Sequence, residues 1–481
     1  MYSMLISIAL LVIGYLLYGR FVEKVFGADP ARPTPAHTMT DGVDYVVMPS
    51  WKVFMIQFLN IAGTGPIFGA ILGAMYGPSC YLWIVFGCIF GGAVHDYLSG
   101  MLSVRHGGKG LPDLVGTYLG GRTRKLMLFF AVFMLLLVAA VFVYSPALIL
   151  GDMIGGGTKS AVLIWVGIIL LYYVIATMVP IDKLIGKIYP VFAVALIFMA
   201  VALLACLIGK WPAGIPEVWD GLANRNPDGG RIFPCLFISI ACGAVSGFHA
   251  TQSPLMARCI GNEKMGRPVF YGAMITEGVI ALIWATVSSW FFFAGGNVEM
   301  GADGIVAAPA VVTKVSKYWL GTFGSILAIL GVVAAPITSG DTALRSARLM
   351  VADALNLNQK PIKNRLAVSM CLFIATGGLL VYNILDAQGF NVLWGYFGWA
   401  NQTLSIFTFW TLTVFLVQHR TGTLYYLITL LPACFMTAVC TTFILTAKIG
   451  FRIPQDYAPL IGAVTFVLSA CIFFWAKRKK L

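Results

Sequence analysis

The sequence predicts an all-helical protein that crosses a membrane about thirteen times. Of its 481 residues, 59% are hydrophobic and only 11% are charged, whereas soluble domains carry about 25% charged residues. Apolar segments of spanning length follow one another along the chain, and glycine-rich stretches interrupt two of them at corresponding places in the two halves. The composition predicts a polytopic membrane protein, and the interruptions predict a binding site within the membrane.

Thirteen apolar segments are candidate spans, and most exceed the ~20 residues that a helix needs to cross the hydrocarbon core. They are residues 2–18, 51–76, 80–102, 125–150, 161–179, 188–208, 232–255, 269–293, 320–339, 366–385, 392–417, 424–445 and 458–475. All ten cysteines lie in or beside these segments. They lack the paired spacing of a disulfide framework or a zinc site, so we interpret them as packing residues.

The net charge of +13 comes mainly from loops on one side of the predicted membrane. If the N-terminus lies outside, most of the 32 Lys and Arg residues fall in cytoplasmic segments, as the positive-inside rule requires. We therefore expect an external N-terminus and a cytoplasmic tail that ends in the basic run from Lys477 to Lys480. The lipid bilayer accounts for the charge distribution, and no nucleic-acid partner is expected.

Ten of the spans divide into two sets of five. After 1–50, which holds the first span and a cytoplasmic loop, the first set occupies 51–208 and the second occupies 232–418. Because five is odd, the second set enters the membrane from the opposite side, which gives the inverted repeats of a leucine-transporter-like fold. An external linker (209–231) joins the sets, and 419–481 adds two helices and the tail.

Two loops contain further expected helices. The amphipathic segment 111–120 follows a basic turn, which predicts an interfacial helix on the cytoplasmic face. The segment 308–318 predicts a short external helix that acts as a lid.

The two interruptions are residues 60–66 and 242–249. Unwound backbone in a bilayer leaves amides and carbonyls without partners unless they line a cavity or hold a ligand. Amides at the start of a half-helix favour a carboxylate, and freed carbonyls favour a cation. The glycines expected to supply this substrate-binding backbone are Gly63, Gly65, Gly243 and Gly247. The alternative is two kinked helices whose polar groups are satisfied by neighbours.

Polar side chains near the interruptions are the candidate substrate ligands. Thr64 lies in the first interruption, and Ser246 and His249 lie in the second. Gln57 and Asn401 offer further hydrogen bonds. Histidine titrates near neutral pH, so His249 is able to carry a proton or to meet a carboxylate; the alternative is a structural hydrogen-bond donor.

Acidic residues inside spans are rare, so each one is a functional candidate. Glu277 is interpreted either as a proton carrier or as a structural hydrogen-bonding acid. Asp96, preceded by His95, is either an acid at membrane depth or an interfacial anchor. Asp341 stands four residues before Arg345, a spacing that favours an ion pair on one helix face. It is also a candidate for proton coupling.

A sodium site is a second hypothesis for coupling. Ala335, Thr338 and Ser339 place a carbonyl and two hydroxyls on one helix face, and small hard cations take oxygen ligands. Together with a carbonyl near Ala62, these oxygens match the sodium-site pattern on the equivalent helix of leucine-transporter-like proteins. The coupling ion is therefore expected to be H⁺ or Na⁺, and no other cofactor is expected.

Six separated motifs resemble those of the carbon starvation protein A transporters, and the resemblance extends from about Trp51 to about Gln418. The motifs are NIAGTGPIFG (60–69), GAVHD (92–96), ACGAVSGFH (241–249), TEGVIALIWA (276–285), DTALRSARLM (341–350) and LWGYFGWANQT (393–403). The chain departs from the family pattern at Ile56-Gln57, where a His-His pair is common, and at His95, where Gln is common. It is also shorter than many members.

The resemblance implies secondary active uptake of peptides or pyruvate-like small carboxylates across the bacterial inner membrane, a role tied to nutrient limitation and coupled to protons. It supports functional roles for Asp96, His249, Glu277, Asp341, Arg345 and Asn401. The sequence contains no phosphate-cradling Gly-Lys loop, His-Glu-x-x-His motif or GxSxG elbow, so we do not expect an enzyme. The alternatives are a nutrient sensor that binds without transport and a proton-translocating respiratory subunit. The second is disfavoured because such subunits rely on mid-membrane lysines.

Overall fold

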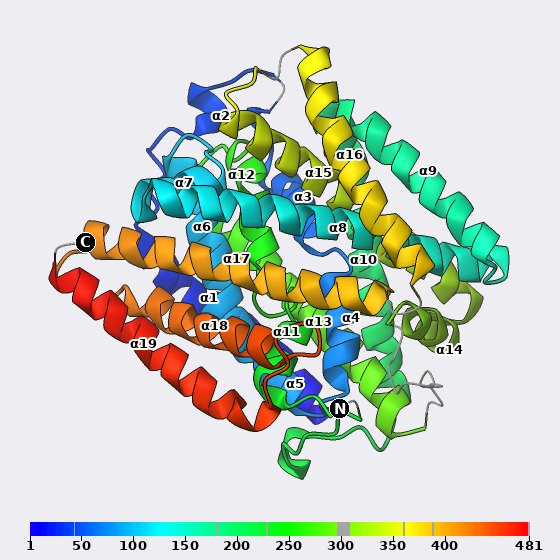
Figure 1. Cartoon of the computed structure of the whole chain (residues 1–481). Coiled ribbons are helices and arrows are strands. Elements are labelled where there is room, and N and C mark those ends of the chain that lie inside the picture. Colours follow the sequence, from blue (N-terminus) through cyan, green and yellow to red (C-terminus); the bar gives the residue numbers. More distant parts are fainter. Residues whose placement is uncertain are drawn as a thin grey trace.

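The computed structural model describes residues 1–42, 44–178, 181–227, 229–295, 308–358, 361–386 and 389–479. Val179 and Lys480, which end two of the predicted segments, lie outside the described residues. Within the described ranges the chain forms a bundle of helices (Figure 1), and its only β pairing is an isolated bridge between Met48 and Ile260. The prediction of an all-helical protein is confirmed.

The described part of the chain contains eleven helical elements as far as Lys210. They are α1 (Tyr2–Phe26), α2 (Pro35–Thr38), α3 (Ser50–Ile61), α4 (Gly65–Ala74), α5 (Ser79–Leu82), the π-helical η1 (Trp83–Gly92), α6 (Ala93–Arg105), α7 (Leu111–Leu119), α8 (Gly121–Gly155), α9 (Lys159–Met178) and α10 (Ile181–Lys210).

The remaining elements follow Lys210. They are η2 (Val218–Asp220), η3 (Ile232–Leu236), α11 (Phe237–Ser239), α12 (Gly247–Ala257), η4 (Glu263–Met265), η5 (Arg267–Tyr271), α13 (Gly272–Phe293), α14 (Ala308–Ala328), η6 (Ile329–Val333), α15 (Ala334–Ala354), α16 (Ile362–Leu385), α17 (Gly389–His419), α18 (Leu427–Thr446), η7 (Gln455–Tyr457) and α19 (Ala458–Arg478).

Among the described residues, ten helices are long and apolar enough to cross a membrane, or eleven if α3 and α4 count as one bent span. The predicted segments 232–255 and 320–339 are not among them. Non-helical backbone divides the first segment between α11 and α12, and the second is distributed over α14, η6 and α15. The count of thirteen spans and the inverted repeat therefore stay predictions.

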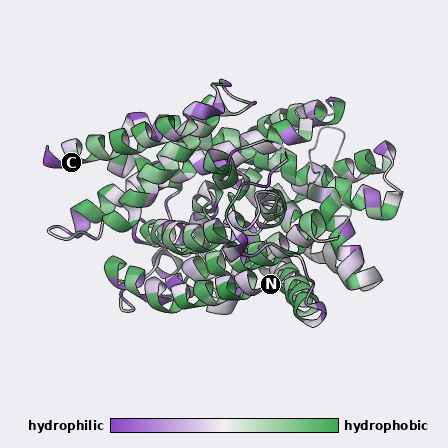
Figure 2. Cartoon of the chain, turned by 90° about the horizontal axis from the view of Figure 1, so that it is seen from below, coloured by the Kyte–Doolittle hydropathy of each residue, from purple (hydrophilic) through white to green (hydrophobic). Residues whose placement is uncertain are grey.

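Burial separates an inner from an outer set of helices. In the span Ser79–Arg105 83% of the apolar window is buried, against 17% in Gln455–Arg478. Large apolar side chains such as Ile374 on α16 and Leu460 on α19 are exposed, and hydrophobic residues predominate along the helices (Figure 2). An exposed surface of this kind suits contact with lipid, whereas the inner helices α6 and α13 hold the polar groups described below.

Both expected loop helices form. Leu111–Leu119 is α7, which buries Leu111, Leu114 and Val115 and packs against α8 and α17. The predicted external helix lies within α14, which is interrupted at Gly321 by a left-handed backbone conformation (φ 61°). Glycine adopts this conformation without the steric cost that a Cβ would add. The residues from Ala308 to Leu320 are thus a distinct helical segment, and their role as a lid stays a prediction.

Candidate functional site at the two broken helices

The first broken helix consists of α3 and α4, whose axes differ in direction by 49° across the break. Pro66 occupies the first turn of α4, where its missing N–H costs nothing because that donor has no partner within the helix. The carbonyl of Thr64 accepts from Phe68 N (2.7 Å) and so starts the new helix. The predicted interruption of this span is confirmed.

The second broken helix extends from α11 to α12, and the backbone between Ile240 and Ser246 is not helical. Asn401 on α17 closes this break. Its Oδ1 accepts from the backbone N–H of Phe248 (2.7 Å) and from the hydroxyl of Ser246 (3.1 Å). A side-chain oxygen therefore satisfies one of the first amides of α12, as capping residues do.

The two breaks lie in contact with each other. A Cβ placed on Gly65 would be 2.3 Å from the Sγ of Cys242, and one placed on Gly243 would be 3.9 Å from the Cα of Pro66. At Gly247 a Cβ would be 2.3 Å from the carbonyl oxygen of Asn401. The distances at Gly65 and Gly247 are too short for a side chain, so glycine is required at these two positions for close packing.

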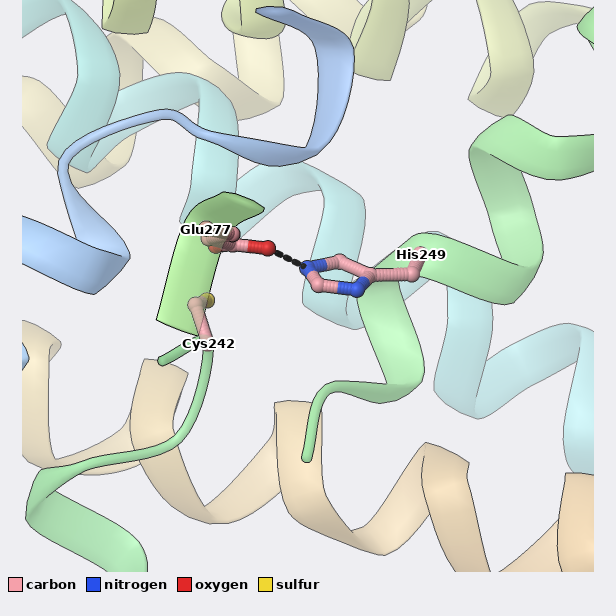
Figure 3. A group of neighbouring side chains, drawn as sticks. All are labelled: Cys242, His249 and Glu277. Carbon is pink, nitrogen blue, oxygen red and sulfur yellow. Dashed lines mark ion pairs between the residues drawn. The ribbon is translucent and has the colours of Figure 1, made fainter. Parts of the chain in front are cut away.

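Four ionisable residues from three helices form one buried group beside the breaks. His249 on α12 donates from Nδ1 to Asp96 Oδ2 on α6 (2.7 Å), and His95 donates from Nδ1 to Asp96 Oδ1 (2.8 Å). On the other side of the ring, His249 Nε2 lies 3.4 Å from Glu277 Oε2 on α13 (Figure 3). All four side chains are completely buried. The sequence singled out each acid, but their meeting at His249 is a finding of the structure.

Several buried polar atoms in this region have no hydrogen-bond partner within the described part of the chain. They belong to Gln57 (Oε1), Asn60 (Oδ1 and Nδ2), Thr64 (Oγ1), His249 (Nε2) and Glu277 (both carboxylate oxygens). The Nε2 of Gln57 donates to Ser253 Oγ (3.4 Å). Buried polar groups without partners are costly, so they indicate that water, an ion or a substrate completes the site.

One of the predicted sodium ligands on α15, Ser339, lies at the first break. Its Oγ donates to the carbonyl of Leu59 (3.0 Å), and Leu59 and Ala62 belong to the last turn and the cap of α3. Thr338 Oγ1 donates to the carbonyl of Ala335 (2.8 Å) within its own helix. A sodium site formed by Ala62, Ala335, Thr338 and Ser339 together stays a prediction.

Asp341 lies in a different environment from the Asp96 group. Its Oδ2 accepts from the hydroxyl of Tyr189 on α10 (3.2 Å), while Arg345 donates to the carbonyl of Ala176 on α9 (2.8 Å). The charges of Asp341 and Arg345 act on each other, and the ion pair expected between them stays a prediction. Their side chains also satisfy partners on α10 and α9, which sequence spacing along one helix does not reveal.

Two further features were missed at the level of sequence. Asn60 and Cys242 flank the breaks but were not predicted to be ligands. An open cavity of about 810 Å³ lies between α8, α9, α14, α16 and α17, and its lining includes Lys159, Lys314 and Lys317. These lysines come from segments far apart in the chain, so no local pattern brings them together.

Comparisons with known proteins agree with this architecture. The family model described as carbon starvation protein CstA matches residues 1–213, 148–317 and 294–443. A membrane protein of Haemophilus influenzae is 46% identical over 332 residues, which cover 59% of this chain and 90% of that protein. The peptide transporter CstA of Escherichia coli is 26% identical (92% of this chain, 81% of that protein). The pyruvate/proton symporter BtsT of Escherichia coli is 24% identical (93% and 81%).

The fold is also similar to that of MhsT, a transporter of the leucine-transporter fold, in its complex with L-phenylalanine. The TM-score is 0.58 at 14% sequence identity, over 87% of this chain and 98% of MhsT. This likeness concerns the fold alone, whereas the family model covers most of the chain. The chain belongs to the carbon starvation protein CstA family.

Proposed function

We propose that the protein is an ion-coupled symporter that takes up small peptides or pyruvate-like carboxylates across the bacterial inner membrane. The observation that carries this proposal is the contact between two broken helices that enclose buried polar atoms without partners. Such breaks at mid-membrane are typical of the binding site of secondary transporters. The names of the relatives, a peptide transporter and a pyruvate/proton symporter, support both substrate classes.

The proposed mechanism is alternating access by two five-helix repeats. Residues 51–208 and 232–418 each begin with a broken helix, as the inverted-repeat arrangement requires. We place the N-terminus outside and the C-terminus in the cytoplasm. The helices that carry the breaks then rock against the rest of the bundle, while 1–50, the linker 209–231 and 419–481 lie outside the repeats.

A substrate carboxylate is proposed to bind at the start of α4, near Gly63, Thr64 and Gly65. The corresponding position at the start of α12 already receives Asn401 Oδ1, so the first break is the better anion site. The hydroxyl of Thr64 has no partner among the described residues and suits a carboxylate oxygen. Gln57 is proposed to contact the rest of the substrate.

Ser246, His249 and Asn401 would then form the opposite wall, with Gly243 and Gly247 allowing the second break to approach. The open cavity is lined by Lys159, by Lys314 and Lys317 of the predicted lid helix, and by Asp152 and Asp386. The three lysines outnumber the two acids, so the net positive charge would raise the local concentration of an anionic substrate. We propose that this cavity is the external entrance.

Two coupling routes are open, and each has a distinct set of residues. In the first, Glu277 and Asp96 exchange a proton through His249, which contacts both carboxylates. Asp341 would contribute through α10. In the second, Na⁺ binds oxygens of Ala62, Ala335, Thr338 and Ser339, which suit a hard cation. The sodium route is supported by the contact of Ser339 with the end of α3.

Uptake into proteoliposomes tests the function and the route together. Purified protein is expected to accumulate labelled pyruvate or dipeptide when a proton or sodium gradient is imposed, but not without a gradient. A sensor that binds without transport would bind the solute and accumulate none. If neither solute accumulates under either gradient, the symporter proposal is wrong.

Paired variants separate the two routes. If protons drive uptake, Glu277→Gln abolishes pH-driven accumulation, whereas Thr276→Val, whose hydroxyl bonds within its own helix (2.9 Å to the Gly272 carbonyl), retains it. If sodium drives uptake, replacement of Na⁺ by choline and the variant Ser339→Ala both stop it. Ser346→Ala on the same helix serves as the control.

A further inference from the structure

Three side chains with metal-binding atoms converge at the second broken helix. Cys242 lies in the break, His249 lies on α12 and Glu277 lies on α13 (Figure 3). Their ligand atoms lie within 4.8 Å of one another, and none of the three side chains is accessible to solvent by more than 2%. Tetrahedral zinc sites separate neighbouring ligand atoms by about 3.3–3.8 Å, so side-chain movements of about an ångström complete the geometry.

His249 is held in the orientation that a metal ligand requires. Its Nδ1 donates to Asp96 Oδ2 (2.7 Å), which leaves the lone pair of Nε2 directed toward Glu277. Asp96 is fixed in turn by His95 (2.8 Å). A histidine that binds zinc usually donates from its other ring nitrogen to a carboxylate, which fixes the orientation of the ring.

The imidazole and carboxylate ligand atoms lie 3.4 Å apart as an ion pair but make no hydrogen bond. Nε2 of His249 and both carboxylate oxygens of Glu277 have no hydrogen-bond partner within the described residues. The Sγ of Cys242 accepts from one donor, Asn401 Nδ2 (3.4 Å). A donor of this kind stabilises a thiolate, which is the form of cysteine that binds metal.

We propose that Cys242, His249 and Glu277 bind one transition-metal dication of the Zn²⁺ class. Sulfur and imidazole ligands select Zn²⁺ and similar ions over Na⁺, Mg²⁺ and Ca²⁺, which prefer oxygen. The thiolate and the carboxylate together neutralise the dication, which is required in a buried site. Three protein ligands leave the fourth position for water or another ligand.

A bound metal would link the second break to α13, because Cys242 lies in the break and Glu277 lies on α13. If the protein works by alternating access, as proposed above, the two elements change their relative position during transport, and the metal would inhibit uptake. This consequence rests on the proposed function, whereas the binding of the metal does not.

Metal binding is tested on the purified full-length protein in detergent after treatment with a chelator. Wild-type protein is expected to retain one equivalent of Zn²⁺ or Co²⁺, and the cobalt form is expected to show a thiolate-to-metal charge-transfer absorption. Cys242→Ser should remove this absorption, and His249→Gln should lower the affinity at least tenfold. Cys440→Ser, which changes another buried cysteine on α18, should bind as wild type does.

One measurement does not depend on the folding of any variant. In native wild-type protein, Zn²⁺ should slow the alkylation of Cys242 by a small reagent, measured by mass spectrometry after the reaction is stopped, and Mg²⁺ should not. Absence of retained metal, absence of the charge-transfer absorption in the cobalt form, or equal retention by wild type and both ligand variants overturns the proposal.

The transport assay then separates the two proposals. Metal binding with uptake that Zn²⁺ inhibits supports the site and its link to α13. Metal binding with unchanged uptake supports the metal site but contradicts the inhibition of transport by the bound metal. Metal binding by a protein that shows no uptake in metal-free buffer supports the site and contradicts the symporter.

Discussion

Asn401 closes the second break through one side-chain oxygen. Its Oδ1 accepts from Phe248 N and Ser246 Oγ, and both donors are buried. Asn401→Leu would leave these donors without a partner, and a buried unsatisfied donor costs about 1–3 kcal/mol. We therefore expect this variant to lose about 2–4 kcal/mol of stability, measured by equilibrium unfolding of the purified protein in detergent.

The control for this variant is Thr403→Val. The Thr403 hydroxyl donates to the carbonyl of Trp399 in its own helix (2.8 Å), so its loss should change stability by no more than about 0.5 kcal/mol. Equal stability of Asn401→Leu and Thr403→Val would contradict the proposed role of Asn401 in closing the break.

The sequence identified most of the individual candidate residues but not the contacts between them. Asp96, His249 and Glu277 are conspicuous because ionisable groups are expensive in apolar spans. Their meeting depends on the packing of α6, α12 and α13, which are distant in the chain, and sequence spacing carries no information on it. Cys242 was interpreted as a packing residue for the same reason, because its neighbours come from α17 and α4.

Among the elements, the contact between the two broken helices is set by Gly65. A Cβ at this position would lie 2.3 Å from the Sγ and 2.4 Å from the Cβ of Cys242. Gly65→Ala therefore has to separate the breaks, at a cost of about 1–3 kcal/mol for an overpacked site. We expect lower thermal stability and a loss of most uptake activity in proteoliposomes.

Gly378→Ala on α16 is the matched control, because no atom lies within 4 Å of its added Cβ. Alanine has a higher helix propensity than glycine, so this variant should be unchanged or up to about 1 kcal/mol more stable. If Gly65→Ala resembles Gly378→Ala in stability and uptake, then close contact of the breaks is not required.

The sequence predicted where the helices lie better than it predicted whether each helix is continuous. Apolar runs located the long helices, and Gly-Thr-Gly-Pro located the first break, because hydropathy and proline chemistry act locally. The second break lies nearer the N-terminus than the expected 242–249, since the backbone is non-helical from Ile240 to Ser246 and α12 begins at Gly247. Its closure by Asn401 is a tertiary contact. The segment 320–339 was predicted as one span, but its residues belong to α14, η6 and α15.

Over the whole molecule, a buried carboxylate joins the end of α1 to elements of both halves. Glu263 is completely buried and accepts from Arg105 Nε and Nη2 (3.2 Å each) and from the backbone N–H of Asp29 (2.7 Å). Removal of one partner of a buried ion pair costs about 3–5 kcal/mol. Glu263→Gln is expected to destabilise the protein by about 3 kcal/mol in unfolding experiments.

The surface pair between Arg231 and Asp456 provides the comparison, because the Asp456 side chain is 83% exposed. Exposed ion pairs contribute about 0–1 kcal/mol, so Asp456→Asn should leave stability nearly unchanged. A similar small effect of both substitutions would show that Glu263 does not hold α1 against the bundle.

The conformation described here is closed around the site, which yields a prediction about the transport cycle. Cys242 is 2% exposed, and Asp96, His249 and Glu277 are completely buried. A carrier that alternates between open states has to expose this region to water on one side at a time. In a variant that keeps Cys242 as its single cysteine, a membrane-impermeant maleimide should react slowly in this closed state. Substrate or a coupling-ion gradient should change the rate severalfold.

Leu222→Cys in the same background gives the reference rate, because Leu222 lies in the linker and is 45% exposed. Its reaction with the maleimide should be fast and independent of substrate. Reaction of Cys242 at the reference rate under every condition would mean that the site is permanently open. A complete lack of reaction under every gradient would mean that the breaks never separate, and a rocking-bundle mechanism would then be untenable for this chain.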